Sequence, residues 1–263
     1  MVFFLIYNTP VKLQELDNYF QNLLSLPLWI SKDISSNGLQ VSRKNQEIQK
    51  VAFAVDASLQ SFRRAVESGA DLLVVHHGLF WGRPIPLTGP HYDRIRFLLD
   101  HDLGLYAAHL PLDAHPEVGN NYGMGKMLGL ENMQPFGDYK GNKIGCKGTL
   151  PQPLTLDKIA QTLVGGREKA LEILRFGPAE IRTVGIVSGG ATMEVLQAID
   201  ENLDLFVTGD ADHTVYHTAL EAGINVIFGG HYATETWGVR LLAQRLKQDT
   251  GLETQFLDLP TGL

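Results

Sequence analysis

Histidines and carboxylates stand at the carboxyl ends of apolar segments in this sequence of 263 residues. Two such segments end in a histidine that is followed, after three intervening residues, by a carboxylate, and a third ends in two adjacent histidines. These residues are His76, His77, His109, Asp113, His231 and Glu235, and Asp210 ends a fourth apolar segment. Imidazole and carboxylate donors suit Zn, Mn, Fe or Co, and the set lacks the thiolates of a structural zinc site. The residue types therefore predict a site for divalent metal ions.

The adjacent histidines indicate more than one metal-binding position. Successive side chains of a strand point to opposite faces, so His76 and His77 can serve two ions, or one ion with the other histidine as its support. Carboxylates such as Asp113 and Glu235 can bridge two divalent ions. Two ions can activate water and polarise a substrate, which is the chemistry of a metal-dependent hydrolase.

Two histidines are candidates for proton transfer in such a reaction, namely His109 beside the predicted ligands and His217 on a predicted helix. His213 and His217 are four residues apart and could bind an ion themselves. Helical faces also carry such pairs by chance. We therefore expect His213 and His217 to orient metal ligands or to contact the substrate. Cys146 lies in a glycine-rich stretch without a neighbouring histidine, and no serine sits in a nucleophile elbow, so no side-chain nucleophile is expected.

Alternating strand and helix patterns must position these residues. Continuous apolar runs of strand length alternate with segments of helical spacing, and further helical spacing occurs near both ends of the chain. The expected strands are 51–56, 71–78, 103–109, 183–190, 204–210 and 224–231. The expected helices are 11–26, 58–70 with a glycine stop at Gly69, 94–102, 191–203, 213–223 and 238–246. This order predicts an α/β fold with mostly parallel sheets covered by helices. In open sheets of this kind, binding groups gather beyond the carboxyl ends of the strands.

The two halves of the chain are related. Residues 51–77 align without a gap on residues 184–210 with five identities in 27 positions, and each half continues to a strand that ends in His-x3-carboxylate. We therefore predict two related, interleaved α/β halves, 1–130 with His-His and His-x3-Asp, and 131–263 with His-x3-Glu. The segment 135–154, rich in Gly and Pro, is interpreted as their connection, with a strand around 143–150, and the C-terminal helix is free to pack back on the first half.

Charge and composition narrow the class of partner. The formal net charge is -7, which argues against nonspecific nucleic-acid binding. The N-terminal apolar run, residues 2–6, is too short for a signal peptide or a membrane span and no basic residue precedes it. Residues 2–7 fit a buried strand or a leader. With a single cysteine, no intrachain disulfide is possible, and we expect a cytoplasmic protein without a membrane partner.

The chain resembles the Nif3-like dinuclear metal-centre proteins, also known as GTP cyclohydrolase 1 type 2 homologues, in their short bacterial form. The resemblance covers nearly the whole chain and rests on DISSNGLQV, VAFAVDAS, GADLLVVHHGLFW, AAHLPLDAHPEVGNN, TGDADHTVYH and GGHYATE. It implies that the ligands are His76, His77, Asp113, His231 and Glu235, with His109 as nearby support. Asp210 stands where many members carry Glu, so its role stays open.

The resemblance also implies a cofactor and an assembly. The cofactor would be two divalent ions drawn from Zn, Fe, Mn, Co or Ni, and the assembly a toroidal homohexamer with the metal sites facing its interior. The apolar segment 79–81, directly after the paired histidines, could wall a pocket or pack at a subunit interface.

Three functions compete. The first is a metal-dependent hydrolase of small molecules, acting on a purine nucleotide as a GTP cyclohydrolase 1 type 2-like enzyme or on a phosphoester. The second is a non-catalytic metal-binding, regulatory or scaffold protein, and the third is a purely structural metal site. Five ligands for two ions leave coordination positions open, and open positions favour the hydrolase.

Overall fold

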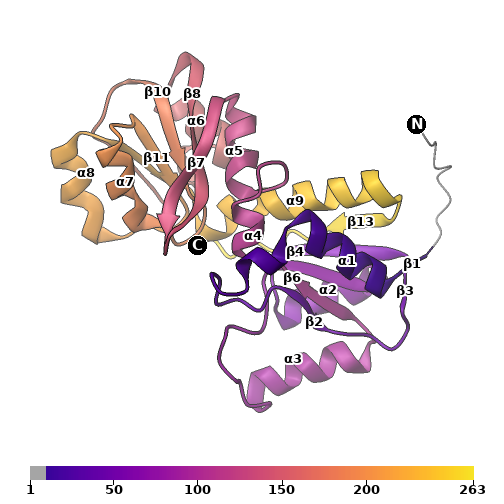
Figure 1. Ribbon diagram of the computed structural model, residues 1–263. Helices are drawn as coiled ribbons and strands as arrows, with labels where there is room; N and C mark the ends of the chain where they lie inside the picture. Colours follow the sequence, from indigo (N-terminus) through magenta and orange to yellow (C-terminus); the bar gives the residue numbers. More distant parts are fainter. Residues whose placement is uncertain (1–9) are drawn as a thin grey trace, which may run out of the picture. The chain divides into compact units, whose positions relative to one another are not determined.

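A computed structural model describes residues 10–263, so the expectation for residues 2–7 lies outside the described part. The chain divides into two compact units (Figure 1). Unit 1 comprises the described residues up to Leu112 together with Val239–Leu259, and unit 2 comprises Asp113–Gly238 together with Pro260–Leu263. Two helices contribute residues to both units, α4 (Leu110–Asp113) and α9 (His231–Thr250). Within the described residues, no helix combines the length and the apolar character needed to cross a membrane.

Unit 1 contains a five-stranded sheet in the order β13-β4-β5-β6-β2. Its strands are β2 (Gly38–Val41), β4 (Lys50–Asp56), β5 (Leu72–His77), β6 (Gly104–Ala107) and β13 (Glu253–Phe256). Four of these strands run parallel, and the edge strand β2 pairs antiparallel with β6. The short strands β1 (Val11–Lys12) and β3 (Glu47–Ile48) form a separate antiparallel pair. The continuous apolar runs of β4 and β5 are those of central strands buried on both faces.

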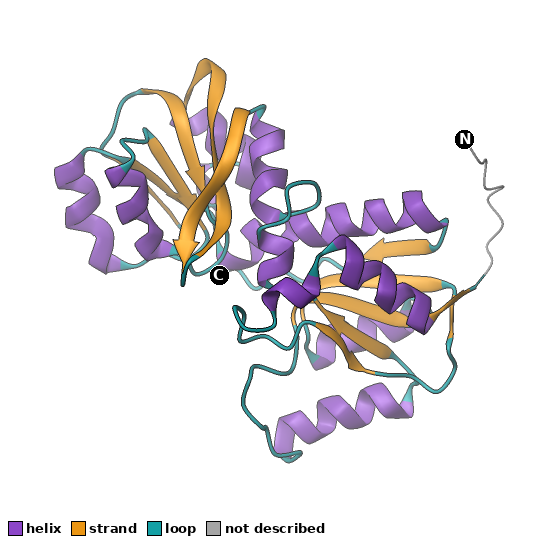
Figure 2. Cartoon of the chain, in the orientation of Figure 1, coloured by secondary structure: helices purple, strands orange, loops and turns teal. Residues whose placement is uncertain are grey.

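Helices cover both faces of the unit 1 sheet (Figure 2). They are α1 (Leu13–Leu23), the 3-10 turn η1 (Leu26–Trp29), α2 (Leu59–Glu67) and α3 (Gly89–Asp100). Phe62 of α2 and Leu98 of α3 pack with Leu105 of the sheet in one buried cluster. Tyr106 points to the opposite face by strand alternation and meets Phe20 of α1, with ring centroids 4.9 Å apart.

Unit 2 contains a six-stranded mixed sheet in the order β7-β8-β10-β11-β12-β9. Its strands are β7 (Glu131–Tyr139), β8 (Asn142–Thr155), β9 (Glu172–Arg175), β10 (Glu180–Ile186), β11 (Leu205–Thr208) and β12 (Asn225–Phe228). The three central strands β10, β11 and β12 are parallel, as the sequence predicts. Antiparallel strands flank them, because the β7-β8 hairpin pairs with β10 and β9 pairs with β12. The predicted α/β class is confirmed, with a second sheet that is mixed.

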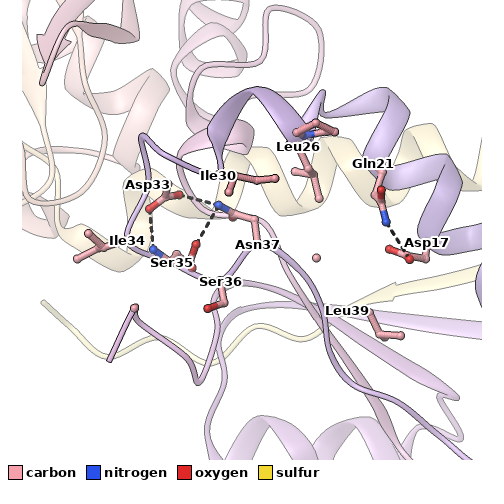
Figure 3. Close-up of a pocket in the computed structure, with 13 residues that line it drawn as sticks. Asp17, Gln21, Leu26, Ile30, Asp33, Ile34, Ser35, Ser36, Asn37 and Leu39 are labelled. Carbon is pink, nitrogen blue, oxygen red and sulfur yellow. Dashed lines mark hydrogen bonds between the residues drawn. The ribbon is translucent and has the colours of Figure 1, made fainter. Parts of the chain in front are cut away.

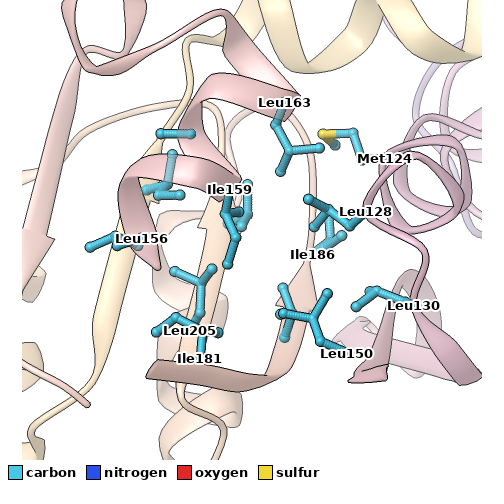
Figure 4. Packing of buried hydrophobic residues seen from close by; sticks show 14 of the residues in the cluster. Met124, Leu128, Leu130, Leu150, Leu156, Ile159, Leu163, Ile181, Ile186 and Leu205 are labelled. Carbon is cyan, nitrogen blue, oxygen red and sulfur yellow. The ribbon is translucent and has the colours of Figure 1, made fainter. Parts of the chain in front are cut away.

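Two layers of helices enclose the unit 2 sheet. They include α5 (Asn120–Leu128), α6 (Leu156–Val164), α7 (Val195–Asp200) and α8 (Tyr216–Ala222), with 3-10 turns η2 (Arg167–Lys169), η3 (Thr192–Glu194) and η4 (His213–Val215). Figure 4 shows Met124 of α5 and Ile159 of α6 packed against Ile186 and Leu205 of the sheet. Burial of each such aliphatic side chain stabilises the fold by about 1.5–3 kcal/mol, so unit 2 has a core that does not depend on a bound ion.

The proposed relation between the halves has a structural counterpart at their first strands. Asp71 Oδ2 accepts hydrogen bonds from the amides of Gln49 and Lys50, at 2.8 and 3.1 Å. Asp204, its partner in the alignment, accepts from the amides of Arg182 and Thr183, at 2.8 and 2.9 Å. Equivalent carboxylates therefore accept hydrogen bonds from the start of equivalent strands in the two units, which supports an internal duplication.

Candidate metal centre

Unit 1 brings three of the predicted histidines together at the carboxyl edge of its sheet. The parallel register sets Asp56 of β4 beside His77 of β5, and sets Val75 of β5 beside Ala107 of β6. The residues that follow these strands therefore lie at the same edge of the sheet. His76, His77 and His109 each offer a ring nitrogen within 4.8 Å of the others. Their ring centroids lie 4.7, 5.0 and 5.7 Å apart.

Each of these imidazoles is held through Nδ1. Nδ1 of His76 lies 3.0 Å from the carbonyl oxygen of Ala108, which can only accept, so this nitrogen carries the proton. Nδ1 of His77 lies 2.8 Å from Asp56 Oδ1, and Nδ1 of His109 lies 3.0 Å from Asp33 Oδ1. A hydrogen bond from Nδ1–H to an acceptor fixes the neutral tautomer in which Nε2 carries the lone pair, as metal-ligating histidines require.

A polar loop before β2 orients His109. Asp33 also accepts a hydrogen bond from the amide of Leu110 at 3.0 Å, and Asn37 Oδ1 accepts from the amide of His109 at 2.7 Å. Asn37 donates to Asp33 Oδ2 at 2.9 Å, so the two side chains form one cradle. Figure 3 shows the hydrogen bonds that join Asp33, Ser35 and Asn37. The three residues line a cavity of about 540 Å³.

The charge of this cradle is negative. Burial alone would raise the pKa of Asp33, but hydrogen bonds from His109 and Asn37 outweigh it and hold the pKa below its ordinary value. The Asp33 carboxylate is therefore ionised at neutral pH. Its negative charge favours a positive charge on the His109 imidazole or on a metal ion bound to that imidazole. Trp81 closes one side of the cluster, with its ring centroid 5.0 Å from that of His109 and its indole N–H donating to the Gly78 carbonyl.

Unit 2 holds the predicted carboxylates. Asp113, at the end of α4, is buried and its Oδ1 accepts hydrogen bonds from Asn120 Nδ2 at 2.8 Å and from Ser188 Oγ at 2.9 Å. Asn120 is itself fixed, because its Oδ1 accepts from the amide of Gly238. A ligand oxygen of Asp113 and one of Glu235 lie within 4.8 Å of each other, so unit 2 presents two buried carboxylates side by side.

His231 and Glu235 occupy successive turns at the start of α9. His231 Nε2 lies 3.2 Å from Glu235 Oε1, and its Nδ1 lies 2.9 Å from Asp210 Oδ1. The hydrogen bond to Glu235 and the attraction of both carboxylates outweigh burial and raise the pKa of His231 to about 9. A divalent ion at Nε2 would replace that proton, since metal and proton compete for the same lone pair.

Gly189 makes room for this pair. Its φ is +66°, and a Cβ at this position would overlap Glu235 Oε1 and stand 3.2 Å from His231 Nε2. The absence of a side chain at Gly189 therefore lets the donors of α9 approach the backbone.

The donors of each unit pass a chemical test for a divalent metal. Three histidines of unit 1 have Nδ1 against a carboxylate or carbonyl, which leaves Nε2 as the ligating atom. Unit 2 holds His231, whose Nδ1 lies against Asp210, and two buried carboxylates. Nitrogen and oxygen donors of this kind suit Zn, Fe, Mn or Co.

Other predicted residues lie elsewhere or take another part. His217 is exposed on α8, where its ring centroid lies 6.4 Å from that of His213, and neither joins a ligand group among residues 10–263. Asp210 orients His231. Cys146 is buried, and burial raises the pKa of its thiol to about 12, so the thiol is un-ionised near neutral pH.

Sequence reasoning missed the residues that orient the ligands: Asp33, Asn37, Asp56, Asn120 and Ser188. Asp33 lies 76 positions from His109 and Ser188 lies 75 positions from Asp113, so no local spacing connects them. Asp33, Asn37, Asp56 and Asn120 lie within the segments that carry the family resemblance, and this is the signal that could have drawn attention to them; Ser188 lies outside those segments.

Comparison with known proteins places the chain among close relatives. A family model described as Duf34/NIF3 (NGG1p interacting factor 3) matches residues 11–261. A relative from Treponema pallidum, named GTP cyclohydrolase 1 type 2 homolog, is 44% identical over 95% of this chain and 99% of its own length. A relative of the same name from Deinococcus radiodurans is 48% identical over 88% of each chain. A solved structure from Thermus thermophilus matches with a TM-score of 0.87 and 40% identity, covering 96% of this chain and 100% of that one.

Proposed function

We propose that this chain, which belongs to the Duf34/NIF3 family, binds two divalent metal ions and acts as a metal-dependent hydrolase. The observation that carries the proposal is the common state of four histidines. Each has Nδ1 held by an acceptor, the arrangement that prepares Nε2 to bind a metal ion.

The ligands in this proposal are His76, His77, Asp113, His231 and Glu235. The first two come from unit 1 and the others from unit 2. Support comes from each unit by itself: the histidines of unit 1 are clustered, and the carboxylates of unit 2 are buried and adjacent. A purely structural role is disfavoured because both units have apolar cores of their own.

When bound, two divalent ions supply Lewis acidity and lower the pKa of coordinated water. The chain's own residues then have distinct tasks. Asp56 and Asp210 keep His77 and His231 in the ligating tautomer. His109, fixed by Asp33, can hold or release a proton at Nε2, and the exposed His217 is the second candidate for proton transfer.

The substrate would be a small molecule, and the name of the relatives, GTP cyclohydrolase 1 type 2 homolog, supports a nucleotide. Phosphoesters are the other class that a two-ion site hydrolyses. We further propose that the chain works in the cytoplasm as a homohexamer. Three large apolar side chains of unit 1, Leu28, Ile30 and Ile34, are 58–82% exposed, and such a surface supports self-association.

The test is a reconstitution assay. The protein is stripped with a chelator, metal loss is verified by elemental analysis, and Zn, Mn, Fe, Co or Ni is added back before incubation with GTP, other nucleotides and phosphoesters. Glu235→Gln is the matched control because it keeps the size of the side chain and removes its charge. We expect turnover only in the reloaded wild-type protein.

Two results would count against the hydrolase. Turnover that survives verified metal loss would exclude metal-dependent chemistry. Two tightly bound ions with no turnover of any substrate in the panel would favour the non-catalytic metal-binding alternative.

A further inference from the structure

A second cavity of unit 1 is lined by the start of α3 and by the loop that follows the paired histidines. Its volume is about 510 Å³, which lies in the usual range for sites that hold a small molecule. Most of its lining is apolar and includes Leu79, Trp81 and Ile85. The polar side chains of the lining are those of Thr88, His91 and Arg94.

The charge of this lining is opposite to that of the whole chain. The formal net charge of the protein is -7, yet no aspartate or glutamate of residues 10–263 lines the cavity. His91 and Arg94 lie in the first two turns of α3, three residues apart, so their side chains share one face of the helix. Because a guanidinium is always protonated, the cavity favours an anionic ligand.

Both basic side chains lack a protein partner for their polar atoms. The guanidinium of Arg94 forms no ion pair or hydrogen bond within the described part of the chain, whereas Arg96 on the same helix pairs with Asp100 at 3.2 Å. Nε2 of His91 is buried and has no hydrogen-bond partner among residues 10–263. The ring of His91 is held edge-on against Phe80, with centroids 5.7 Å apart. Buried polar atoms are nearly always hydrogen-bonded, so a ligand is the expected partner of this nitrogen.

Trp81 joins the cavity to the histidines of unit 1. Its ring lines the cavity, and its centroid lies 5.9 Å from that of His77 and 5.0 Å from that of His109. The indole N–H donates to the Gly78 carbonyl at 2.9 Å, which holds the ring in this position. A molecule whose anionic group is bound by Arg94 can therefore rest an aromatic ring on Trp81, beside the proposed metal centre.

We propose that this cavity binds a nucleotide, with its phosphate group on Arg94 and His91 and its base against the apolar lining. A guanidinium forms paired hydrogen bonds with phosphate oxygens, and the imidazole of His91 can donate another. The inference rests on the proposed function, since it names the substrate class of that site, but the binding step itself requires no metal ion.

The experiment is a calorimetric titration of the metal-free full chain, because a bound metal ion would itself attract phosphate. The ligands are GMP, guanosine and inorganic phosphate. We expect GMP to bind about ten-fold or more tightly than either of the others, since it alone combines the charged group with the base. Arg94→Gln should lower GMP affinity about ten-fold or more, and His91→Phe, which keeps an aromatic ring against Phe80, should lower it about two- to ten-fold. Arg96→Gln is the matched control, with the same loss of charge from the same helix, and should keep the wild-type affinity.

Several results would overturn the inference. They are equal affinity for GMP and guanosine, equal affinity for GMP and inorganic phosphate, and an unchanged GMP affinity in Arg94→Gln. An equal loss in Arg94→Gln and Arg96→Gln would also overturn it, because general charge attraction would then explain the binding. Intact GMP binding without turnover in the reconstitution assay would support the nucleotide site and contradict the hydrolase. Metal-dependent turnover of nucleotides that is unaffected by Arg94→Gln would overturn the site and leave the hydrolase standing.

Discussion

Replacing Gly189 with alanine should damage the donors of unit 2 without touching a ligand. The backbone at this position is held in place, because its amide donates to Thr234 Oγ1 and its carbonyl accepts from the amides of Gly209 and Asp210. The added methyl group therefore cannot move away, and the Glu235 carboxylate must retreat by about 1 Å to regain van der Waals separation.

Two effects of different size follow. The positive φ of +66° makes alanine less favourable than glycine by about 1–2 kcal/mol, which lowers the free energy of unfolding. Displacement of Glu235, with His231 Nε2 also crowded at 3.2 Å, should lower metal affinity by about 10- to 100-fold, the usual range for disturbing the support of a ligand.

A matched control separates the two effects. Gly129 ends α5 with φ +72°, and a Cβ added there meets nothing within 4 Å. Gly129→Ala should thus lose about the same 1–2 kcal/mol in urea unfolding of the metal-free protein and keep wild-type metal affinity in a competition titration with a chromophoric chelator. If Gly189→Ala binds metal as tightly as Gly129→Ala, then Glu235 is not a ligand and the assignment in unit 2 is wrong.

Three further predictions concern single residues. Asp210→Ala should weaken metal binding by about 10- to 100-fold in the same titration, because Nδ1 of His231 loses its acceptor; an unchanged affinity would remove Asp210 from the site. Cys146 should resist iodoacetamide at pH 8 in the folded protein and react in urea, since a thiol with a pKa of about 12 has almost no thiolate at pH 8; rapid labelling of folded protein would contradict its burial. His77→Ala should lose metal and keep the wild-type circular dichroism spectrum, whereas a collapsed spectrum would mean that the metal is structural.

Much of the fold follows from local patterns. The strands that carry the ligands are continuous apolar runs, and β4, β5, β10, β11 and β12 lie where such runs occur. The β7-β8 hairpin was harder to predict, because a segment rich in glycine and proline is typical of a connection between domains. Its turn is Lys140-Gly141, both with positive φ, and Gly145 sits in a strand because its Cα lies against the Ile186 carbonyl, where a side chain would collide.

The ligands were easier to predict than the residues that hold them. A ligand must stand at a strand or helix end with a recognisable side chain, and His76 and Glu235 do so. An orienting acceptor is defined by tertiary contact alone, as Asp33 is with His109 across 76 positions. A sequence pattern of short period carries no information on such a pair.

The central claim is that the chain binds two divalent ions, and the metal content of the wild-type protein tests it most directly. After chelation and reconstitution with Zn²⁺ or Co²⁺, elemental analysis should give two equivalents per chain, and anomalous diffraction should show them about 4 Å apart. A ratio that saturates at one equivalent, or two ions far from each other, would contradict the account.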